Sequence, residues 1–505
     1  MRKAVIAAAA LSLVVLGAAA PANAVDKVNS KRLRDAVTVN GILGHERVLQ
    51  RIAGQNGGTR ASGTPGYAAS AAYVKDTLTA AGYRVSEQEF TFPFFRELAP
   101  PTLAQLTPAP TGYTTRTFDF SGSGDVTGTV VPTTDVQVPA PATPGVSSGC
   151  EAADFTPAGT APAIALVQRG ACTFQIKASN AVAAGYDAVV IFNEGQPGRT
   201  DVLSGGLGKL FGIPVVGLSY ADGAALFTAT QAGTVTARVT TATFADEAAK
   251  TSNVFAETPG GDPDKVLVVG SHLDSVIEGP GINDNGSGVA TDLEIAEQLA
   301  ALKVKPRQKI RFAFWGAEEA GLLGSEHYVA TLPDADLARI FANLNFDMLG
   351  SPNYVRFVYD GDGSQTTVTG PPGSGEIERV FTDYFAGQGL ATEPREFNGR
   401  SDYGPFIAVG IPAGGVFSGA EGKKTEAQAT VYGGAAGAAY DACYHQACDT
   451  TNNVNPTALA ELSDAAAHAV YTLAMTRTGF FPDGSLRAAA ARSMPKAPRG
   501  THPLR

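Results

Sequence analysis

Cysteine, histidine and tryptophan are scarce in this 505-residue sequence, which has four, six and one of them, respectively. The spacings of Cys150 to Cys172 and of Cys443 to Cys448 match neither a zinc finger nor a zinc ribbon, which disfavours a cysteine-based metal site. A low and even cysteine count is typical of disulfides in an exported protein. Proximity favours the pairs Cys150–Cys172 and Cys443–Cys448, and four free thiols are the alternative.

Long apolar runs are missing from the sequence after residue 24. The chain begins with the basic residues Arg2 and Lys3, is apolar from Ala4 to Ala20, and has small residues at Ala22 and Ala24. This pattern predicts a secretory signal over residues 1–24, cleaved after Ala24. A membrane anchor is the alternative, but the run is slightly shorter than the ~20 residues that a span needs. We therefore expect an extracellular protein without membrane contact.

Basic residues are in the minority, since 38 Lys and Arg stand against 48 Asp and Glu, for a net charge of −10. Without residues 1–24 and without the basic tail 484–505, 31 basic residues would stand against 48 acidic ones, for −17. Such a chain repels phosphate backbones, which excludes nucleic acid as a partner. The tail could be removed on maturation or could simply be disordered.

Apolar and charged residues make up 44% and 17% of the chain, which predicts a large core and more than one domain. After residue 252, short apolar segments alternate with helical patterns, which indicates an α/β fold with a mostly parallel sheet between helices. The expected strands are 266–270, 310–315 and 340–346, and the expected helices are 288–302, 321–332, 376–387 and 456–476. Helical segments within 49–81 complete this domain, so we expect it to comprise residues 25–110 and 246–483.

Residues 115–242 have a different composition, which is rich in Thr, Pro, Gly and Val and poor in charged residues. Strands are expected at 164–167, 188–192 and 213–218, with a helix at 176–184. This predicts a separate β-rich unit inserted into the first domain. It contains no histidine, which fits a non-catalytic unit.

Acidic and histidine residues follow the expected strands of the α/β domain. They are His272, Asp284, Glu318, Glu319, Asp347 and His445. Because the carboxyl ends of parallel strands meet at one edge, these side chains can converge although they are distant in sequence. Two zinc ions need one bridging carboxylate and further imidazole or carboxylate ligands on each side. Each residue alone has a structural explanation, such as a core histidine or a turn aspartate, but together they predict a two-zinc site. His45, His327, His468 and His502 lie outside this pattern and are expected to be structural or solvent-exposed.

Seven motifs give the chain a specific resemblance. They are Gly270-Ser271-His272-Leu273-Asp274-Ser275, Gly281-x-Asn283-Asp284-Asn285-Gly286-Ser287-Gly288, Phe314-Trp315-Gly316-Ala317-Glu318-Glu319, Asn345-Phe346-Asp347-Met348, Gly399-Arg400-Ser401-Asp402-Tyr403, Gly410-Ile411-Pro412 and Tyr444-His445. The chain resembles secreted bacterial di-zinc aminopeptidases of the leucyl aminopeptidase or aminopeptidase Y type. Residues 115–242 resemble the protease-associated (PA) domain, through Arg169-Gly170, Cys172-Thr173-Phe174 and Ile213-Pro214. In relatives this domain is a non-catalytic lid or interaction module. The alternative for this chain is a purely structural insertion.

The resemblance implies a role for each residue of the site. His272 and Asp347 would bind one zinc, Glu319 and His445 would bind the other, and Asp284 would bridge both. Glu318 would be the general base, and Tyr444 would donate a hydrogen bond to the developing oxyanion. Asp274 would orient His272 through its second ring nitrogen. Nothing indicates calcium, although it is not excluded.

The resemblance also places a substrate pocket. Arg400 would hold the substrate backbone, with pairing to Asp402 as the alternative. Met348, Gly399 and Phe417 would line an apolar pocket for the first side chain, or would merely pack in the core. The implied function is hydrolysis of the N-terminal peptide bond of peptides with large hydrophobic N-termini, by a monomeric enzyme.

Three other functions remain alternatives at this point. A zinc carboxypeptidase would need a basic pocket for a C-terminal carboxylate, and Arg400 is the one basic residue placed near the site. A glutaminyl cyclase would need one metal. A receptor-like homologue would have lost some of the ligands.

Overall fold

The structure is a computed structural model that describes residues 28–477. The expected signal segment 1–24 and basic tail 484–505 therefore lie outside the described residues. Within the described part, no helix has the length and apolar character needed to cross a membrane.

A parallel sheet forms the centre of the α/β region. Its strands are β9 (Asp262–His272), β10 (Gln308–Trp315), β11 (Ile340–Asn345) and β14 (Ala413–Gly414), in the order β14-β11-β9-β10. These neighbours pair in parallel, and β8 (Thr236–Glu257) joins the edge of β10 in the antiparallel sense. The predicted mostly parallel sheet between helices is confirmed.

Alternate side chains of the central strands enter two different cores. Leu267 and Val269 of β9 point into the larger core, whereas Val266 and Val268 point into a smaller one. The larger core includes helices α1 (Lys31–Arg34), α2 (Val39–Gln55), α3 (Pro65–Ala80), α6 (Ser287–Ala301), α9 (Ser374–Gly387) and α12 (Pro456–Met475). The smaller core includes α7 (Leu323–Thr331), α8 (Asp334–Leu337) and α10 (Tyr403–Ala408). The strands are therefore apolar on both faces, which explains their continuous apolar runs.

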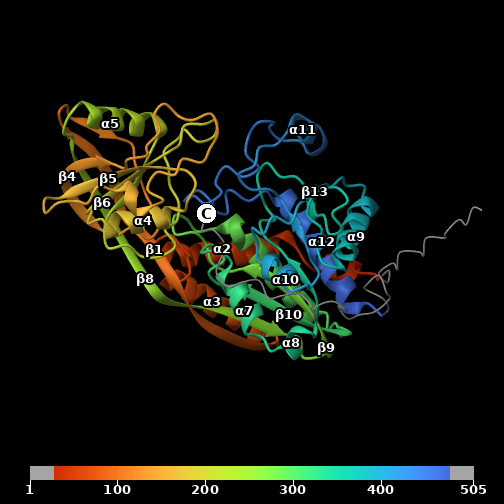
Figure 1. The fold of residues 1–505 in the computed structure, drawn as a ribbon. Coiled ribbons are helices and arrows are strands. Elements are labelled where there is room, and N and C mark those ends of the chain that lie inside the picture. The colour runs from red at the N-terminus through yellow and green to blue at the C-terminus, as the bar shows by residue number, and fades with distance from the viewer. Residues whose placement is uncertain (1–27, 478–505) are drawn as a thin grey trace, which may run out of the picture.

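A long two-stranded ribbon connects the two parts of the molecule (Figure 1). Its strands, β1 (Arg84–Thr107) and β8, pair antiparallel from Arg84 and Glu257 to Thr107 and Thr236. One end of β8 pairs with β10, and the other end pairs with β4 (Gly124–Pro132). The expected boundary between residues 242 and 246 lies inside this continuous strand. We therefore propose the division into two regions with β8 crossing between them.

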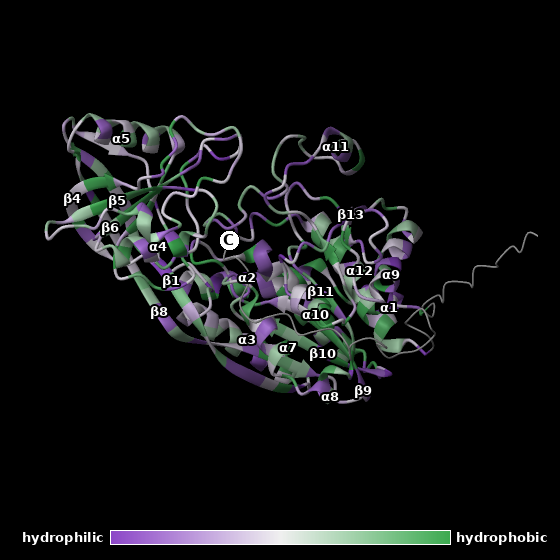
Figure 2. Ribbon diagram, in the orientation of Figure 1, coloured by the Kyte–Doolittle hydropathy of each residue, from purple (hydrophilic) through white to green (hydrophobic). Residues whose placement is uncertain are grey.

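The inserted region continues the sheet from β4 through β5 (Ala163–Gln168), β6 (Ala188–Phe192) and β7 (Val215–Leu218) to β3 (Arg116–Thr117). Alternate β5 residues again face two cores, one with α4 (Phe174–Ala183) and one with α5 (Tyr220–Ala232). Figure 2 shows β5 in the green of hydrophobic residues. The remaining elements are β2 (Thr111–Tyr113), η1 (Ala152–Asp154), η2 (Ile282–Gly286), β12 (Phe357–Tyr359), β13 (Glu393–Arg395), β15 (Val416–Phe417) and α11 (Glu426–Tyr432).

Both predicted disulfides are present. Cys150 is bonded to Cys172, and Cys443 is bonded to Cys448. The first closes a loop before α4, and the second closes the short loop that carries His445.

Replacing Phe312 with alanine should lower the free energy of unfolding by about 3–5 kcal/mol, because the change leaves a cavity in a close-packed interior. Phe312 lies in the larger core and is completely buried. Leu98→Ala is the control, since Leu98 is 54% exposed and its loss should cost less than about 0.5 kcal/mol. Denaturant unfolding followed by circular dichroism measures both, and equal losses would contradict the expected burial of Phe312.

Candidate functional site

All six candidate ligand and base residues converge at the carboxyl edge of the parallel strands. His272 ends β9, Glu318 and Glu319 follow β10, Asp347 follows β11, Asp284 lies in η2, and His445 lies in the loop closed by the second disulfide. The sequence prediction that strand ends bring these side chains together agrees with their positions in the structure.

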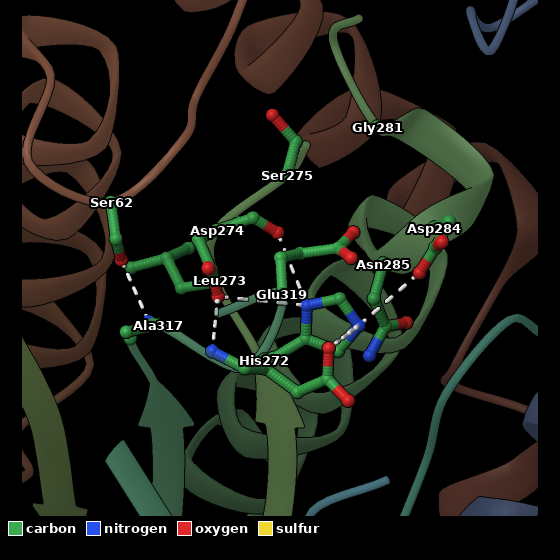
Figure 3. A network of polar contacts seen from close by, with 12 residues as sticks. Ser62, His272, Leu273, Asp274, Ser275, Gly281, Asp284, Asn285, Ala317 and Glu319 are labelled. Atoms are coloured by element: carbon green, nitrogen blue, oxygen red, sulfur yellow. Dashed lines mark hydrogen bonds and ion pairs between the residues drawn. The ribbon is translucent and has the colours of Figure 1, made fainter. Parts of the chain in front are cut away.

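Asp284 lies between the two histidines. Its Oδ1 is 3.2 Å from Nε2 of His272, and its Oδ2 is 3.2 Å from Nε2 of His445. Oδ1 of Asp347 is 3.3 Å from the same His272 nitrogen, and Oε2 of Glu319 is 3.0 Å from the same His445 nitrogen. Two groups of potential metal ligands therefore share Asp284, and Figure 3 shows its contact with the His272 ring.

The charge of this site and its carboxylate oxygens without hydrogen bonds fit divalent cations. Oδ1 of Asp347 and Oε1 of Glu319 are buried and have no hydrogen-bond partner within the described part of the chain. Burial, followed by the charge of Asp284, raises the pKa of Glu319 to about 7. Burial lowers the pKa of His445, but Glu319 and Asp284 outweigh it and raise this pKa to about 11. Crowded carboxylates and imidazoles of this kind are the donors that zinc prefers.

Two asparagines beside Asp284 tie its loop to the segment that carries Asp347. Asn285 donates to the Phe346 carbonyl at 2.9 Å, and its Oδ1 accepts from the backbone one residue after Asp347 at 3.2 Å. Asn283 accepts from the backbone N–H of residue 350 at 2.9 Å. These bonds fix the two carboxylates relative to each other.

Two further side chains hold the ligands and were missed in the sequence. Ser401 donates to Oδ2 of Asp347 at 2.6 Å. Asp449 accepts from the backbone N–H groups of Asn283 and Asp284 at 2.8 and 2.9 Å. Their place beside Arg400 and beside the second disulfide was a signal, but their partners are too remote in sequence to be predicted from it.

Arg60 supports the site from behind and was also missed. It is completely buried, and its guanidinium donates to the backbone carbonyls of Leu273, Pro280 and Gly281. Burial lowers its pKa to about 10. Because these carbonyls flank His272 and Asp284, one buried cation joins the two loops that carry them.

Glu318 faces the same space at a greater distance. Its Oε2 is 3.9 Å from Nε2 of His272, and its backbone N–H donates to Oδ1 of Asp274 at 3.2 Å. Asp274 contacts the second ring nitrogen of His272. Nδ1 of His272 is 3.1 Å from the backbone carbonyl of Asp274 and 3.7 Å from its carboxylate, which agrees with the predicted role of Asp274 in orienting this ring.

Tyr444 and Arg400 lie together beside the second histidine. The Tyr444 ring stacks on His445 with centroids 3.8 Å apart, and Arg400 Nη2 donates to the Tyr444 hydroxyl at 3.2 Å. Arg400 also pairs with Glu421, not with Asp402 as in the alternative considered above. The guanidinium therefore holds the phenol at the edge of the site.

A cleft of about 1520 Å³ opens over these residues. Met348, Gly399 and Phe417 line it, as the substrate-pocket prediction requires, together with Leu322 and Leu323. Met348 is only 2% exposed, so most of its side chain packs inside the protein. The cleft exceeds the ~300–1,000 Å³ of typical small-molecule sites, and it has room for more than one residue of a peptide.

The other described histidines lie outside this site. His45 contacts Tyr73 at 2.6 Å, His327 stacks on Phe90, and His468 contacts Ser30 at 2.7 Å. Their structural interpretation agrees with these contacts, and His502 lies outside the described residues.

Comparisons with known proteins identify the family of this chain. Residues 253–470 match the model of peptidase family M28, and residues 126–226 match that of the PA domain. An aminopeptidase of Pseudomonas aeruginosa is 48% identical over 437 residues, which are 85% of this chain and 79% of the relative. Leucine aminopeptidase 2 of Trichophyton rubrum is 43% identical over 334 residues, which are 66% of each chain.

Solved structures extend the likeness to the fold. The aminopeptidase from Aneurinibacillus sp. strain AM-1 has a TM-score of 0.68 at 26% identity, over 89% of this chain and 97% of that one. A zinc aminopeptidase from Bacillus subtilis has a TM-score of 0.57 at 25% identity, over 88% and 95%. This chain therefore belongs to peptidase family M28, as a zinc aminopeptidase that also carries a PA domain.

Proposed function

We propose that this aminopeptidase holds two zinc ions and removes large hydrophobic residues from the free N-termini of peptides. The observation that carries the proposal is the position of Asp284, whose two oxygens face two different histidines at the same distance. His272 and Asp347 would complete the coordination of one ion, and Glu319 and His445 would complete that of the other. Zinc at this site supplies a water with a pKa lowered toward neutrality and polarises the scissile carbonyl.

Glu318 fits the role of general base. It lies within the cleft, but its carboxylate is farther from His272 than those of Asp284 and Asp347. It can therefore take a proton from the attacking water and deliver it to the departing amine. The bond from its backbone N–H to Asp274 holds it in place for both transfers.

Tyr444 fits the role of oxyanion donor. Burial, followed by the charges of Asp284 and Glu319, raises the pKa of the Tyr444 phenol above its ordinary value, so it carries a proton at neutral pH. The hydroxyl accepts from Arg400, which leaves its own proton free to point into the cleft. A donor placed where negative charge develops stabilises the transition state by several kcal/mol.

The residues that line the cleft favour a substrate with a free N-terminal amine and an apolar first side chain. The carboxylates around the two histidines attract a substrate amine, whereas a blocked N-terminus lacks that group. Leu322, Leu323 and Phe417 supply apolar surface for a side chain such as Leu, Met or Phe. Burying such a side chain contributes about 1.5–3 kcal/mol.

The alternatives have less support. A receptor-like protein would not keep all these ligands together, and the similar proteins named above are aminopeptidases. The two disulfides favour an oxidising location, so we infer that the enzyme acts outside the cytoplasm.

Substrates with and without a free amine test the proposed reaction. Leu-p-nitroanilide should be hydrolysed, and its N-acetyl form should be a poor substrate, because it lacks the amine that the carboxylates attract. A series with Leu, Met, Phe, Gly and Glu at the first position measures the side-chain preference. Hydrolysis of the blocked compound alone would contradict an aminopeptidase.

Exchanging Glu318 for glutamine should lower kcat by about 10²–10⁴-fold, because the amide cannot accept the proton from water. Metal content and thermal unfolding should stay unchanged, because Glu318 is not a proposed ligand. Glu326→Gln is the control, since Glu326 also lines the cleft but lies outside both ligand groups. Full activity of Glu318→Gln would remove Glu318 from the mechanism.

Removing zinc with a strong chelator should abolish hydrolysis, and added zinc should restore it. Metal analysis of the purified protein should give two zinc ions per chain. Asp284→Asn should lose zinc from both positions, whereas Asp347→Asn should weaken one position more than the other. A stoichiometry of one in the unaltered protein would contradict the shared carboxylate.

A further inference from the structure

The cleft over the metal site continues onto the inserted region. We call its lining residues between Pro93 and Gly208 the PA wall, and those from His272 to His445 the metal wall. The walls are opposite in charge. The metal wall has eight carboxylates, from Asp274, Glu278, Asp284, Glu318, Glu319, Glu326, Asp347 and Glu421, against two arginines, Arg395 and Arg400. It therefore stays negative even when two divalent cations are counted with it.

The PA wall is basic. Four arginines line it, namely Arg96, Arg116, Arg169 and Arg199, against two carboxylates, Glu97 and Asp119. This local excess runs against the chain as a whole, which carries ten more acidic than basic residues. In a protein with so few basic residues, four guanidiniums on one wall of the catalytic cleft point to a ligand of opposite charge.

The surroundings of these arginines leave charge available for that ligand. Arg116 is exposed on β3 and forms no ion pair with another residue in the range 28–477. Arg199 pairs with Glu194 at 2.7 Å, but Glu194 also accepts from two backbone N–H groups. Among the described residues, the Arg169 guanidinium donates to the Asn193 amide oxygen at 3.3 Å and forms no ion pair with a carboxylate. The pair Arg169 and Arg199 therefore shares one acid between two guanidiniums.

We propose that the PA wall binds carboxylate groups on the part of a peptide substrate that follows its first residue. This inference rests on the proposed function, which places the substrate amine at the metal wall. A short peptide carries a positive amine at one end and a negative carboxylate at the other, so its charges match those of the two walls. Guanidinium is well suited to this contact, because its planar fork donates two parallel bonds to a carboxylate.

Two sources could supply the carboxylate, a free C-terminus or an Asp or Glu side chain. Both present the same chemical group to the arginines, and two series of peptide substrates distinguish them. One series has Leu followed by alanines, from dipeptide to hexapeptide, each as the free acid and as the C-terminal amide. A second series keeps the amide and places one glutamate at successive positions. Leu-p-nitroanilide reaches only the metal wall and reports the chemistry alone.

The unaltered enzyme should prefer the acid over the amide, or the glutamate peptides over the alanine amides, in kcat/KM. Arg116→Ala and Arg169→Ala should each reduce that preference about two- to fivefold, the range of exposed ion pairs. Arg116→Glu should favour the amide. Salt should weaken the preference, because exposed charges are screened. Arg238→Ala is the control, since Arg238 is also in the inserted region but lies outside this cleft and pairs with Asp125.

Equal kcat/KM for acids, amides and glutamate peptides in the unaltered enzyme would overturn the proposal. So would an equal loss of Leu-p-nitroanilide and peptide hydrolysis in Arg116→Ala and Arg169→Ala, since this would show a structural role for the arginines. Failure of the unaltered enzyme to hydrolyse Leu-p-nitroanilide and free-amine peptides would instead contradict the proposed function.

Discussion

The position of one carboxylate controls the arrangement of the whole site. Asp284 has to present one oxygen to His272 and the other to His445, although these histidines lie more than 170 residues apart in sequence. The neighbouring bonds serve that requirement: Asn283 and Asn285 tie the loop to the segment of Asp347, and Asp449 ties it to the loop of His445. A shift of this loop would therefore disturb both ligand groups at once.

The strands and helices that could be predicted from the sequence are those whose own residue pattern determines their structure. Strands such as β9 and β10 are buried on both faces, so they appear as unbroken apolar runs. The candidate ligands were found because parallel strands end at one edge, which places residues after each strand in a common region. The disulfide pairs followed from proximity alone.

The elements that could not be predicted depend on partners far along the chain. β8 is rich in Thr, Ala and charged residues and has no clear apolar run, because it is a strand by virtue of pairing with β1. Ser401, Asp449 and Arg60 act through ligand loops that are distant in sequence. The carboxylate of Asp274 also accepts from the Glu318 backbone, a contact that only the folded loops create.

The ribbon of β1 and β8 explains how a peptidase can accommodate a whole extra domain. In an antiparallel pair, the chain leaves the peptidase and returns to it about 5 Å away, one strand spacing. Phe92 lies opposite Ala249, so a tight turn near these residues would close a complete hairpin on the edge of β10. Growth at the tip of such a hairpin adds mass without cutting any strand of the catalytic sheet. The inserted region therefore extends beyond the carboxyl ends of the parallel strands, the same edge that carries the metal-binding loops, and this is why its residues line the cleft over the metal site.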